Sequence, residues 1–229
     1  MELAIYSALA LSAPFNILIT QWQAQQPATP LAMRWHPSTI IEKELNAGHE
    51  ADVVIATVET VDRLIQSGIA VQSSRIEVVD SPIGIAVLAG AVHPDISNRA
   101  SLVESLLSSR SVAWSEAGAS GVFFARLLKQ LGIDAELRAR GTVIPAGFTA
   151  EQLVNGKADL AVQQISELLM VEGIDIVGPL PPETQQPISL SAAVLKSAGQ
   201  PEAGAEFLTW LKSPPVTEIF SQFGLMRRD

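Results

Sequence analysis

Short apolar runs alternate along the chain with longer segments in which apolar residues recur every three or four positions. Such runs are typical of buried strands, and the longer periodic segments are typical of amphipathic helices. In the first part of the chain the predicted strands are residues 3–7, 31–35 and 52–57, and the predicted helices are residues 12–25, 40–47 and 58–67. This β-α-β-α-β-α order predicts an α/β layer with a parallel sheet.

Polar side chains gather where these predicted strands end. In open α/β sheets, ligands bind beyond the carboxyl ends of the strands. The expected contacts in this part of the chain are Ser7, Ala8, Ser38 and Thr39, with Thr57 nearby. The alternative for Ser38 and Thr39 is that they only cap the helix that follows them.

The pattern changes around Pro82, because a long apolar run follows the proline with no helix in between. We interpret this run as a crossing between two lobes, and residues 179–187, which are too rich in proline for an internal strand or helix, as a second crossing. The expected first lobe comprises residues 1–80 and 189–229, and the second comprises residues 81–188.

The remaining predicted elements are assigned to the two lobes in chain order. Those of the second lobe are helices over residues 102–107, 122–131, 151–155 and 165–170, and strands over 111–114, 159–163 and 174–177. A strand over residues 189–195 and helices over 201–212 and 216–223 complete the first lobe.

Residues 111–132 combine a strand, a polar loop and a helix, and they carry the candidate chemistry of the second lobe. Ser120 is a predicted N-cap, and Gly121 would let a partner approach the backbone closely. Free N–H groups of the first helical turn, with the Ser115 and Ser120 hydroxyls, would then point at an anion. The alternative is a capped turn that binds nothing.

Composition excludes several classes of function. With 15 basic and 24 acidic residues the net charge is −9, and no cluster of Lys or Arg stands out, so nucleic acid and anionic membranes are poor partners. The chain has no cysteine, which excludes disulfides, thiolate zinc sites and thiol nucleophiles. No metal-ligand spacing and no Ser/His/Asp set is recognisable, and we expect no cofactor.

The apolar start of the chain, residues 1–19, differs from a secretory leader. Glu2 stands where a basic residue belongs, and Pro14 and Asn16 interrupt the apolar run. We therefore expect this segment to be part of the fold. The protein would be periplasmic if a leader has been removed before Met1, and cytoplasmic if Met1 is the native start.

Residues 48–55 read Gly-His-Glu-Ala-Asp-Val-Val-Ile, which resembles a Gly-x-x-Ala-Asp-hydrophobic signature of the molybdate-binding-like bacterial solute-binding proteins, extracellular solute-binding family 11. Segments 62–68, 81–89, 156–159, 177–181 and 201–224 follow in the order of that family. The resemblance implies a type II periplasmic-binding-protein fold, in which two α/β lobes are hinged around a ligand cleft. It also implies a monomer that binds a small anion, with the membrane component of an ABC transporter as a partner.

The chain departs from the molybdate binders at two positions. It has Ala10 or its neighbours where they carry a serine after the first strand, and Gln164 where they carry a tyrosine. Segments 114–122 and 163–168 are more similar to a branch that includes bacterial aconitate isomerases. The resemblance therefore implies an organic acid or another oxyanion rather than molybdate.

Two classes of function remain open. The first is a binding protein that holds an anion by hydroxyls and backbone N–H groups. The second is an isomerase of a small unsaturated carboxylic acid, which needs a base beside the acidic carbon. The candidate bases are His36, Glu116 and Glu167. Gln163 and Gln164 are candidate ligand contacts, or ordinary residues at the end of a strand.

Overall fold

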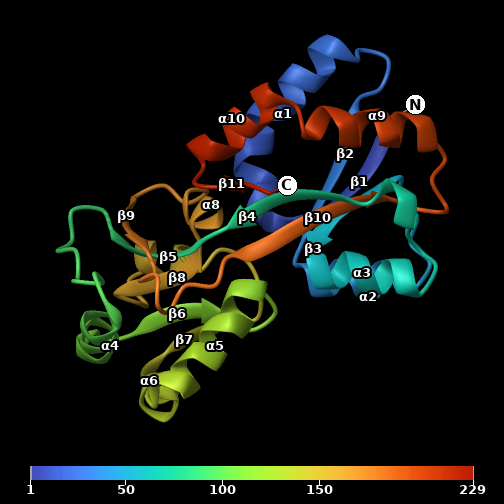
Figure 1. Cartoon of the computed structure of the whole chain (residues 1–229). Helices are drawn as coiled ribbons and strands as arrows, with labels where there is room; N and C mark the ends of the chain where they lie inside the picture. The colour runs from blue at the N-terminus through green and yellow to red at the C-terminus, as the bar shows by residue number, and fades with distance from the viewer. Residues whose placement is uncertain (1, 229) are drawn as a thin grey trace. The chain divides into compact units, whose positions relative to one another are not determined.

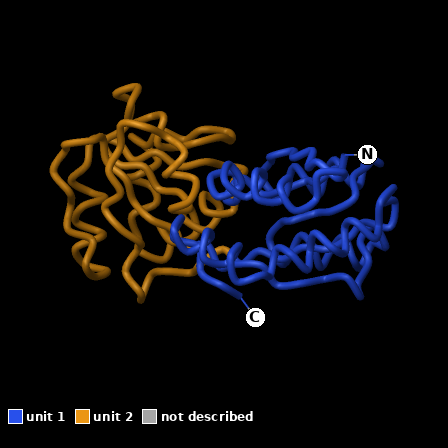
Figure 2. The backbone as a smooth tube through the Cα atoms, turned by 90° about the horizontal axis from the view of Figure 1, so that it is seen from above, with its two compact units in different colours: residues 1–81, 189–229 blue, residues 82–188 orange. Residues whose placement is uncertain are grey.

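The computed structural model describes residues 2–228. Met1 and Asp229, with which the expected first lobe begins and ends, lie outside the described residues. The chain divides into two compact units, which are coloured separately in Figure 2. Unit 1 comprises residues 1–81 and 189–229, and unit 2 comprises residues 82–188.

Unit 1 contains a six-stranded sheet in the order β11-β4-β10-β3-β1-β2 (Figure 1). Its strands are β1 (Leu3–Ala8), β2 (Leu31–His36), β3 (Val53–Thr57), β4 (Ile76–Ser81), β10 (Ile188–Val194) and β11 (Met226–Arg227). β1 pairs in parallel with both β2 and β3, as the alternation of strands and helices predicts. β10 is antiparallel to β3, and β11 is antiparallel to β4, so the sheet is mixed.

Helices cover both faces of this sheet. They are α1 (Ser12–Gln25), α2 (Ser38–Asn46), α3 (Val58–Gln66), α9 (Pro201–Leu211) and α10 (Pro214–Gln222), with short 3-10 turns η1 (Leu9–Leu11) and η2 (Gln72–Ser74). One face packs against α2 and α3 through a cluster that includes Ile41, Val54 and Leu64. α1, α9 and α10 lie on the other face (Figure 1). The apolar start of the chain is thus built into β1 and α1.

Aromatic rings fill the space between α1 and α9. Trp22 makes edge-to-face contacts with Phe207 and Trp210, whose ring centroids lie 5.4 and 5.1 Å away. Gly204 lets α9 approach the sheet, because a Cβ there would lie 3.3 Å from methyl groups of Val53 and Val194. Aromatic contacts of this kind join α9 to α1, while the close approach at Gly204 places α9 on strands β3 and β10.

Unit 2 contains a five-stranded sheet in the order β7-β6-β8-β5-β9. The strands are β5 (Ile83–Leu88), β6 (Val112–Ser115), β7 (Thr142–Ile144), β8 (Leu160–Gln164) and β9 (Ile174–Pro179). β6 is parallel to β7 and β8, whereas β5 is antiparallel to β8 and β9. β9 lies at the edge, where a strand that ends in proline is tolerated.

The helices of unit 2 are α4 (Arg99–Ser108), α5 (Ala119–Leu131), α6 (Asp134–Arg140), α7 (Glu151–Val154) and α8 (Ile165–Leu168). α4, α5 and α6 pack on one face of the sheet through residues such as Leu106, Phe124 and Leu137. α7 and α8 pack on the other face through Leu153 and Leu168. Trp114 of β6 meets Phe124 of α5 edge-to-face, with ring centroids 5.7 Å apart.

Pro82 separates β4 from β5, which belong to different sheets. Proline has no N–H group and cannot donate to a ladder, so the strand pairing ends there. The apolar run predicted to follow Pro82 is therefore β5, a strand of unit 2.

Besides the two 3-10 turns, four elements of the described chain were not predicted from the sequence: β4, α6, β7 and β11. β7 and β11 are three and two residues long, too short for a periodic signal. α6 did carry a signal, because Asp134 and Glu136 occupy its first turn and Arg138 and Arg140 its last. Charges placed in this way suit the helix dipole, and Arg138 Nε donates to Asp134 Oδ1 at 2.8 Å.

Candidate functional site

Polar side chains of unit 1 meet at the carboxyl ends of β1 and β3, and we call Ser7, Ser38 and Thr57 the unit 1 cluster. Ser7 is fully buried, and its hydroxyl donates weakly to the carbonyl of Ala8 at 3.3 Å. The Oγ of Ser38 accepts the N–H of Thr57 at 3.0 Å. The proton of the Ser38 hydroxyl therefore remains available to donate to a ligand.

Ser38 and Thr39 do not cap α2, which was the alternative to a role in binding. Pro37 is the N-cap of α2, and no side chain caps that end. Ser38 is the first residue of the helix and joins it to β3 instead. Thr39, by contrast, is exposed.

The second group of polar residues lies at the carboxyl ends of β6 and β8, and we call Ser115, Ser120, Gln164, Ser166 and Glu167 the unit 2 cluster. All five side chains are buried. Ser115 Oγ, Gln164 Oε1 and Ser166 Oγ have no hydrogen-bond partner among the described residues. An unpaired buried polar group costs roughly 1–3 kcal/mol, so three of them in one place indicate a site whose hydrogen bonds a ligand would complete.

The N-terminus of α5 lies beside Ser115. The first-turn N–H groups of a helix have no partner within it and carry a partial positive charge. The prediction that Ser120 is the N-cap is wrong, because the helix begins at Ala119 and Gly118 is the N-cap. Ser120 is thus inside the first turn of the helix, where it is 1% exposed.

Gly121 is required by the close packing of α5 on the end of β6, whether or not an anion binds there. A Cβ built on Gly121 would lie 1.7 Å from the carbonyl oxygen of Ser115 and 3.0 Å from its Oγ. The backbone of α5 therefore packs directly on the end of β6. A side chain at Gly121 would therefore collide with the Ser115 backbone and disturb the fold, whether or not it also obstructed a ligand.

Gln163 and Gln164 differ in their freedom to bind. Gln163 Oε1 accepts from the Thr149 N–H at 2.8 Å and the Thr149 hydroxyl at 3.0 Å, while its Nε2 donates to the Gly147 carbonyl at 3.0 Å. Gln163 therefore holds the loop before α7. Gln164 keeps Oε1 without a partner among the described residues and is the better candidate for a ligand contact.

Glu167 is the third residue of α8, and its side chain is only 5% exposed. Its Oε1 accepts from Gln164 Nε2 at 3.1 Å. Burial raises its pKa to about 7, although hydrogen bonds from Gln163, from Gln164 and from the Gln164 backbone N–H act in the opposite direction. The hydrogen bond from the backbone of Gln164, which is the N-cap residue of α8, is one half of a capping box.

The other candidate bases have different surroundings. Glu116 is exposed, and its backbone N–H donates to Ile144 at the end of β7. His36, at the end of β2, is half-buried, and its ring centroid lies 6.0 Å from that of Tyr6. Neither lies among unpaired buried polar atoms as Glu167 does.

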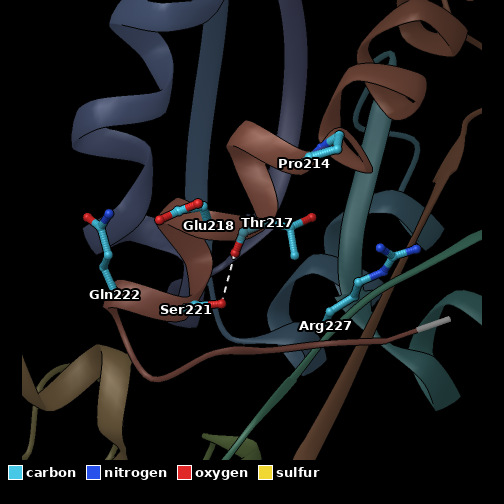
Figure 3. Close-up of a pocket in the computed structure, with 6 residues that line it drawn as sticks. All are labelled: Pro214, Thr217, Glu218, Ser221, Gln222 and Arg227. Carbon is cyan, nitrogen blue, oxygen red and sulfur yellow. Dashed lines mark hydrogen bonds between the residues drawn. The ribbon is translucent and has the colours of Figure 1, made fainter.

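Three surface hollows, two in unit 1 and one in unit 2, lie apart from these clusters. The hollow in Figure 3, about 560 Å³ in volume, is formed by α10 and Arg227. Its hydroxyls are already used within the helix, since Thr217 donates to Ser213 at 3.1 Å and Ser221 donates to Thr217 at 3.1 Å. This hollow is therefore a weaker candidate than the unit 2 cluster.

No group of three or more His, Asp or Glu side chains within residues 2–228 is placed to hold a metal ion. Among the same residues, no helix combines the length and apolar character that crossing a bilayer requires.

The model of the family described as bacterial extracellular solute-binding protein matches residues 3–226, which is nearly the whole chain. The chain belongs to this family. The resemblance drawn from residues 48–55 and the segments after them is thus confirmed.

The similarity of this bacterial extracellular solute-binding protein to curated proteins points to one branch of the family. Over 186 residues it is 36% identical to an aconitate isomerase of a Pseudomonas species, a match that covers 81% of this chain and 71% of that one. This is the branch that segments 114–122 and 163–168 indicated.

Solved structures show the fold of this solute-binding protein. The periplasmic molybdate-binding protein of Azotobacter vinelandii matches with a TM-score of 0.83 and 20% identity over 99% of this chain and 100% of that one. The sulfate-binding protein SubI of Mycobacterium tuberculosis matches with a TM-score of 0.80 and 14% identity over 100% and 88%. These likenesses confirm the type II periplasmic-binding-protein fold.

Sequence reasoning about this family member missed Ser166. A serine that follows a strand and starts a helix looks like a cap, and its burial without a partner is visible only in three dimensions. At the position of the first departure, Ala10 is fully buried in η1 and carries no hydroxyl.

Proposed function

We propose that the chain binds a small organic anion, held by hydroxyl groups and by the backbone N–H groups at the N-terminus of α5. The observation that carries this proposal is Ser115 Oγ, which is buried beside that helix end and has no partner among the described residues. A helix N-terminus with adjacent hydroxyls is a favourable place for negative charge, even in a chain whose net charge is −9.

Organic carboxylates are the favoured class of ligand. The 36%-identical relative is named for aconitate, a tricarboxylate, whereas the relatives named for molybdate and sulfate are at most 20% identical. Gln164 supports the same choice, since it presents an unpaired amide oxygen, an acceptor. A fully deprotonated oxyanion offers no proton to such an acceptor, but a ligand with a hydroxyl or protonated carboxyl group does.

The unit 1 cluster supplies further groups of the same kind. The Ser38 hydroxyl has a proton to donate, and Ser7 is buried at the end of the neighbouring strand. Ser7, Ala8, Ser38, Thr39, Ser115, Ser120, Gly121, Gln163 and Gln164 form the proposed contact set. Gln163 is a less favoured member of the set, because its amide already bonds to Thr149, Gly147 and Glu167.

The cellular setting follows from the family. Extracellular solute-binding proteins deliver solutes to a transporter, so we infer that the partner is the membrane component of an ABC transporter. The chain would then act in the periplasm as a monomer.

Binding is tested by calorimetry with cis-aconitate, trans-aconitate, citrate, molybdate and sulfate. A carboxylate should bind, and Ser115→Ala and Ser120→Ala should each weaken it about 10- to 100-fold, since a hydrogen bond to a charged group contributes roughly 1.5–3 kcal/mol. Ser108→Ala is the matched control, because the Ser108 hydroxyl donates to a carbonyl within α4. Submicromolar binding of molybdate with no binding of carboxylates would contradict the proposed ligand class.

A second candidate function is isomerisation of an unsaturated carboxylic acid. It is favoured by the 36% identity to an aconitate isomerase and by one buried carboxyl group, Glu167, in the unit 2 cluster. Binding and isomerisation use the same hydroxyls and N–H groups. They differ in whether a side chain exchanges a proton with the ligand.

A further inference from the structure

Glu167 is a buried carboxyl group whose partners are all uncharged. The other buried acid of the described chain, Asp52, accepts two backbone N–H groups at 2.8 and 2.9 Å. Glu167 instead accepts from the amide of Gln164 at 3.1 Å, and no Arg or Lys contributes to its pKa. A group that served only as a helix cap would be more stable at the surface, where water solvates the carboxylate.

The elements that pack on α8 offer no compensating charge. They are β5, β8 and β9. On these strands, all of which are described, Asp175 of β9 is the one titratable residue. Its carboxylate accepts the Gly90 N–H at 2.8 Å and lies 3.9 Å from His93. Burial therefore dominates at Glu167, and both of its protonation states are populated near neutral pH.

Polar groups that need partners surround this carboxyl group. Gln164 is the N-cap residue of α8, and Ser166 lies in its first turn. Gln164 Oε1 and Ser166 Oγ are both buried and have no hydrogen-bond partner among the described residues. β6 and β8 are parallel with Ala113 opposite Ala161, so two residues further on Ser115 comes opposite Gln163. Neighbouring strands are roughly 4.8 Å apart, which brings the N-terminus of α5 close to the start of α8.

We propose that Glu167 is the catalytic residue that carries the proton when a bound unsaturated carboxylic acid is isomerised, an inference that rests on the second candidate function. The carboxylate removes a proton from the methylene group next to the C=C bond, and the C–H electron pair forms a new C=C bond. The pair of the former C=C bond moves to its far carbon, which takes the proton back from the Glu167 carboxyl group. No oxidant, reductant or cofactor is consumed.

The other groups of the unit 2 cluster would stabilise the intermediate. Between the two proton transfers the negative charge spreads from the allylic carbons into the attached carboxylate. The Ser115 and Ser120 hydroxyls and the first-turn N–H groups of α5 are donors suited to that charge. Gln164 acts as a positioning residue, because its Nε2 holds one oxygen of Glu167 in place.

The test follows cis-aconitate by proton NMR in deuterated buffer with the full chain. Wild-type protein should produce trans-aconitate and exchange the methylene protons for deuterium. Glu167→Gln should lose both rates by about 100-fold or more, the usual contribution of general acid–base catalysis. It should still bind trans-aconitate with a dissociation constant within about threefold of wild type, since Gln keeps the size of the side chain and one acceptor oxygen, and Gln also suits this position of a capping box. Glu172→Gln, at an exposed position shortly after α8, is the matched control and should leave the rates unchanged.

The pH profile separates a catalytic role from a structural one. A base must be deprotonated, so the wild-type rate should fall as pH decreases through about 7, the pKa of Glu167. If Glu167→Gln does not fold, Glu167→Asp replaces it. Its carboxyl group is one methylene shorter, and it should lose about tenfold in rate while its unfolding temperature stays measurable.

The remaining outcomes of this experiment separately contradict the role of Glu167, the isomerase function and the binding of aconitate. If Glu167→Gln keeps the wild-type rates, the isomerase candidate survives but Glu167 is not its base. If wild type binds aconitate without exchange or isomerisation, both the role of Glu167 and the isomerase candidate are wrong, and the binding function remains. If wild type binds no aconitate, this inference also fails, and binding of another anion still decides the proposed function.

Discussion

At the scale of single residues, the unit 2 cluster combines buried groups that a stable protein would otherwise avoid. Ser115, Gln164 and Ser166 each hide a polar atom without a partner among the described residues, and Glu167 hides a carboxyl group. Together these cost free energy of folding. Retaining four such groups at one sheet edge is understandable if they serve a ligand, because local rules of foldability are most often broken at functional sites.

The buried carboxyl group predicts a pH-dependent stability. The pKa of Glu167 rises from 4.5 to about 7 on folding, so the folded chain holds the proton more tightly than the unfolded chain. The contribution of this carboxyl group to the free energy of unfolding is largest below pH 4.5, and it falls by about 3 kcal/mol as pH rises to 7. Between pH 5 and pH 8, denaturant titrations should therefore show Glu167→Gln gaining about 2.5 kcal/mol relative to wild type.

The comparison with Glu172→Gln isolates the effect. Glu172 is exposed, so its substitution should change the free energy of unfolding equally at both pH values. Parallel pH curves for wild type and Glu167→Gln would mean that the Glu167 carboxyl group is better solvated than its burial indicates.

At the scale of elements, the junction between β6 and α5 is the most constrained part of unit 2. The helix starts so close to the strand that position 121 has no room for a side chain. The same closeness brings the first-turn N–H groups of α5 to the Ser115 hydroxyl. The packing that fixes the fold here and the geometry that would bind an anion are therefore one arrangement.

Substitution of Gly121 should damage the fold itself. In Gly121→Ala the new methyl group would lie 1.7 Å from the Ser115 carbonyl oxygen, which is part of the backbone and cannot rotate away. Overpacking of this kind costs about 3 kcal/mol or more, so thermal unfolding should occur at a clearly lower temperature or the protein should fail to fold. Gly199→Ala is the control, because its Cβ would meet only Asp52 Oδ1 at 3.8 Å. An unchanged melting temperature for Gly121→Ala would contradict the packing of α5 on β6.

The sequence predicts helices and strands well where the apolar pattern extends over many residues. It predicts caps and side-chain roles poorly, because contacts between distant residues determine them. The predicted helix over residues 12–25 coincides with α1, and the strand predicted over residues 52–57 begins one residue before β3. The cap of α5 was misplaced at Ser120, because Ser and Gly both suit an N-cap and only the packing of the chain selects Gly118. Gln163 and Gln164 likewise cannot be told apart in the sequence. The hydrogen bond from Thr149, 14 residues away, shows in the structure that the Gln163 amide already has a partner.

At the scale of the whole molecule, distant parts of the chain complete unit 1. Asp52, at the start of β3, accepts the Ala4 N–H of β1 through Oδ2 and the Gln200 N–H that precedes α9 through Oδ1. One carboxylate thus joins segments that are 48 and 148 residues away in sequence. Near the other end, Arg228 donates to Glu77, Asp80 and the Ser189 hydroxyl and so ties the last described residue to β4 and β10.

Loss of the Asp52 charge should weaken this closure. In Asp52→Asn one backbone N–H would face an amide NH₂ group instead of an oxygen, which leaves a buried donor unpaired at a cost of about 2 kcal/mol. Chemical denaturation should show this loss, whereas Glu50→Gln, at an exposed neighbouring position, should be neutral. Equal stability of Asp52→Asn and wild type would mean that the segments before α9 and around β1 are held by other contacts.

The position of β10 has a consequence for the order in which the protein forms during synthesis. β10 lies between β4 and β3 in the sheet of unit 1, yet the ribosome makes it only after all of unit 2. Unit 2 is one continuous segment, so it can fold as soon as it emerges. Until β10 has been made, β3 and β4 have open edges, and strands with open edges are prone to pair with other chains. We therefore expect a chain stalled before residue 188 to carry a folded unit 2 and an incomplete, chaperone-dependent unit 1.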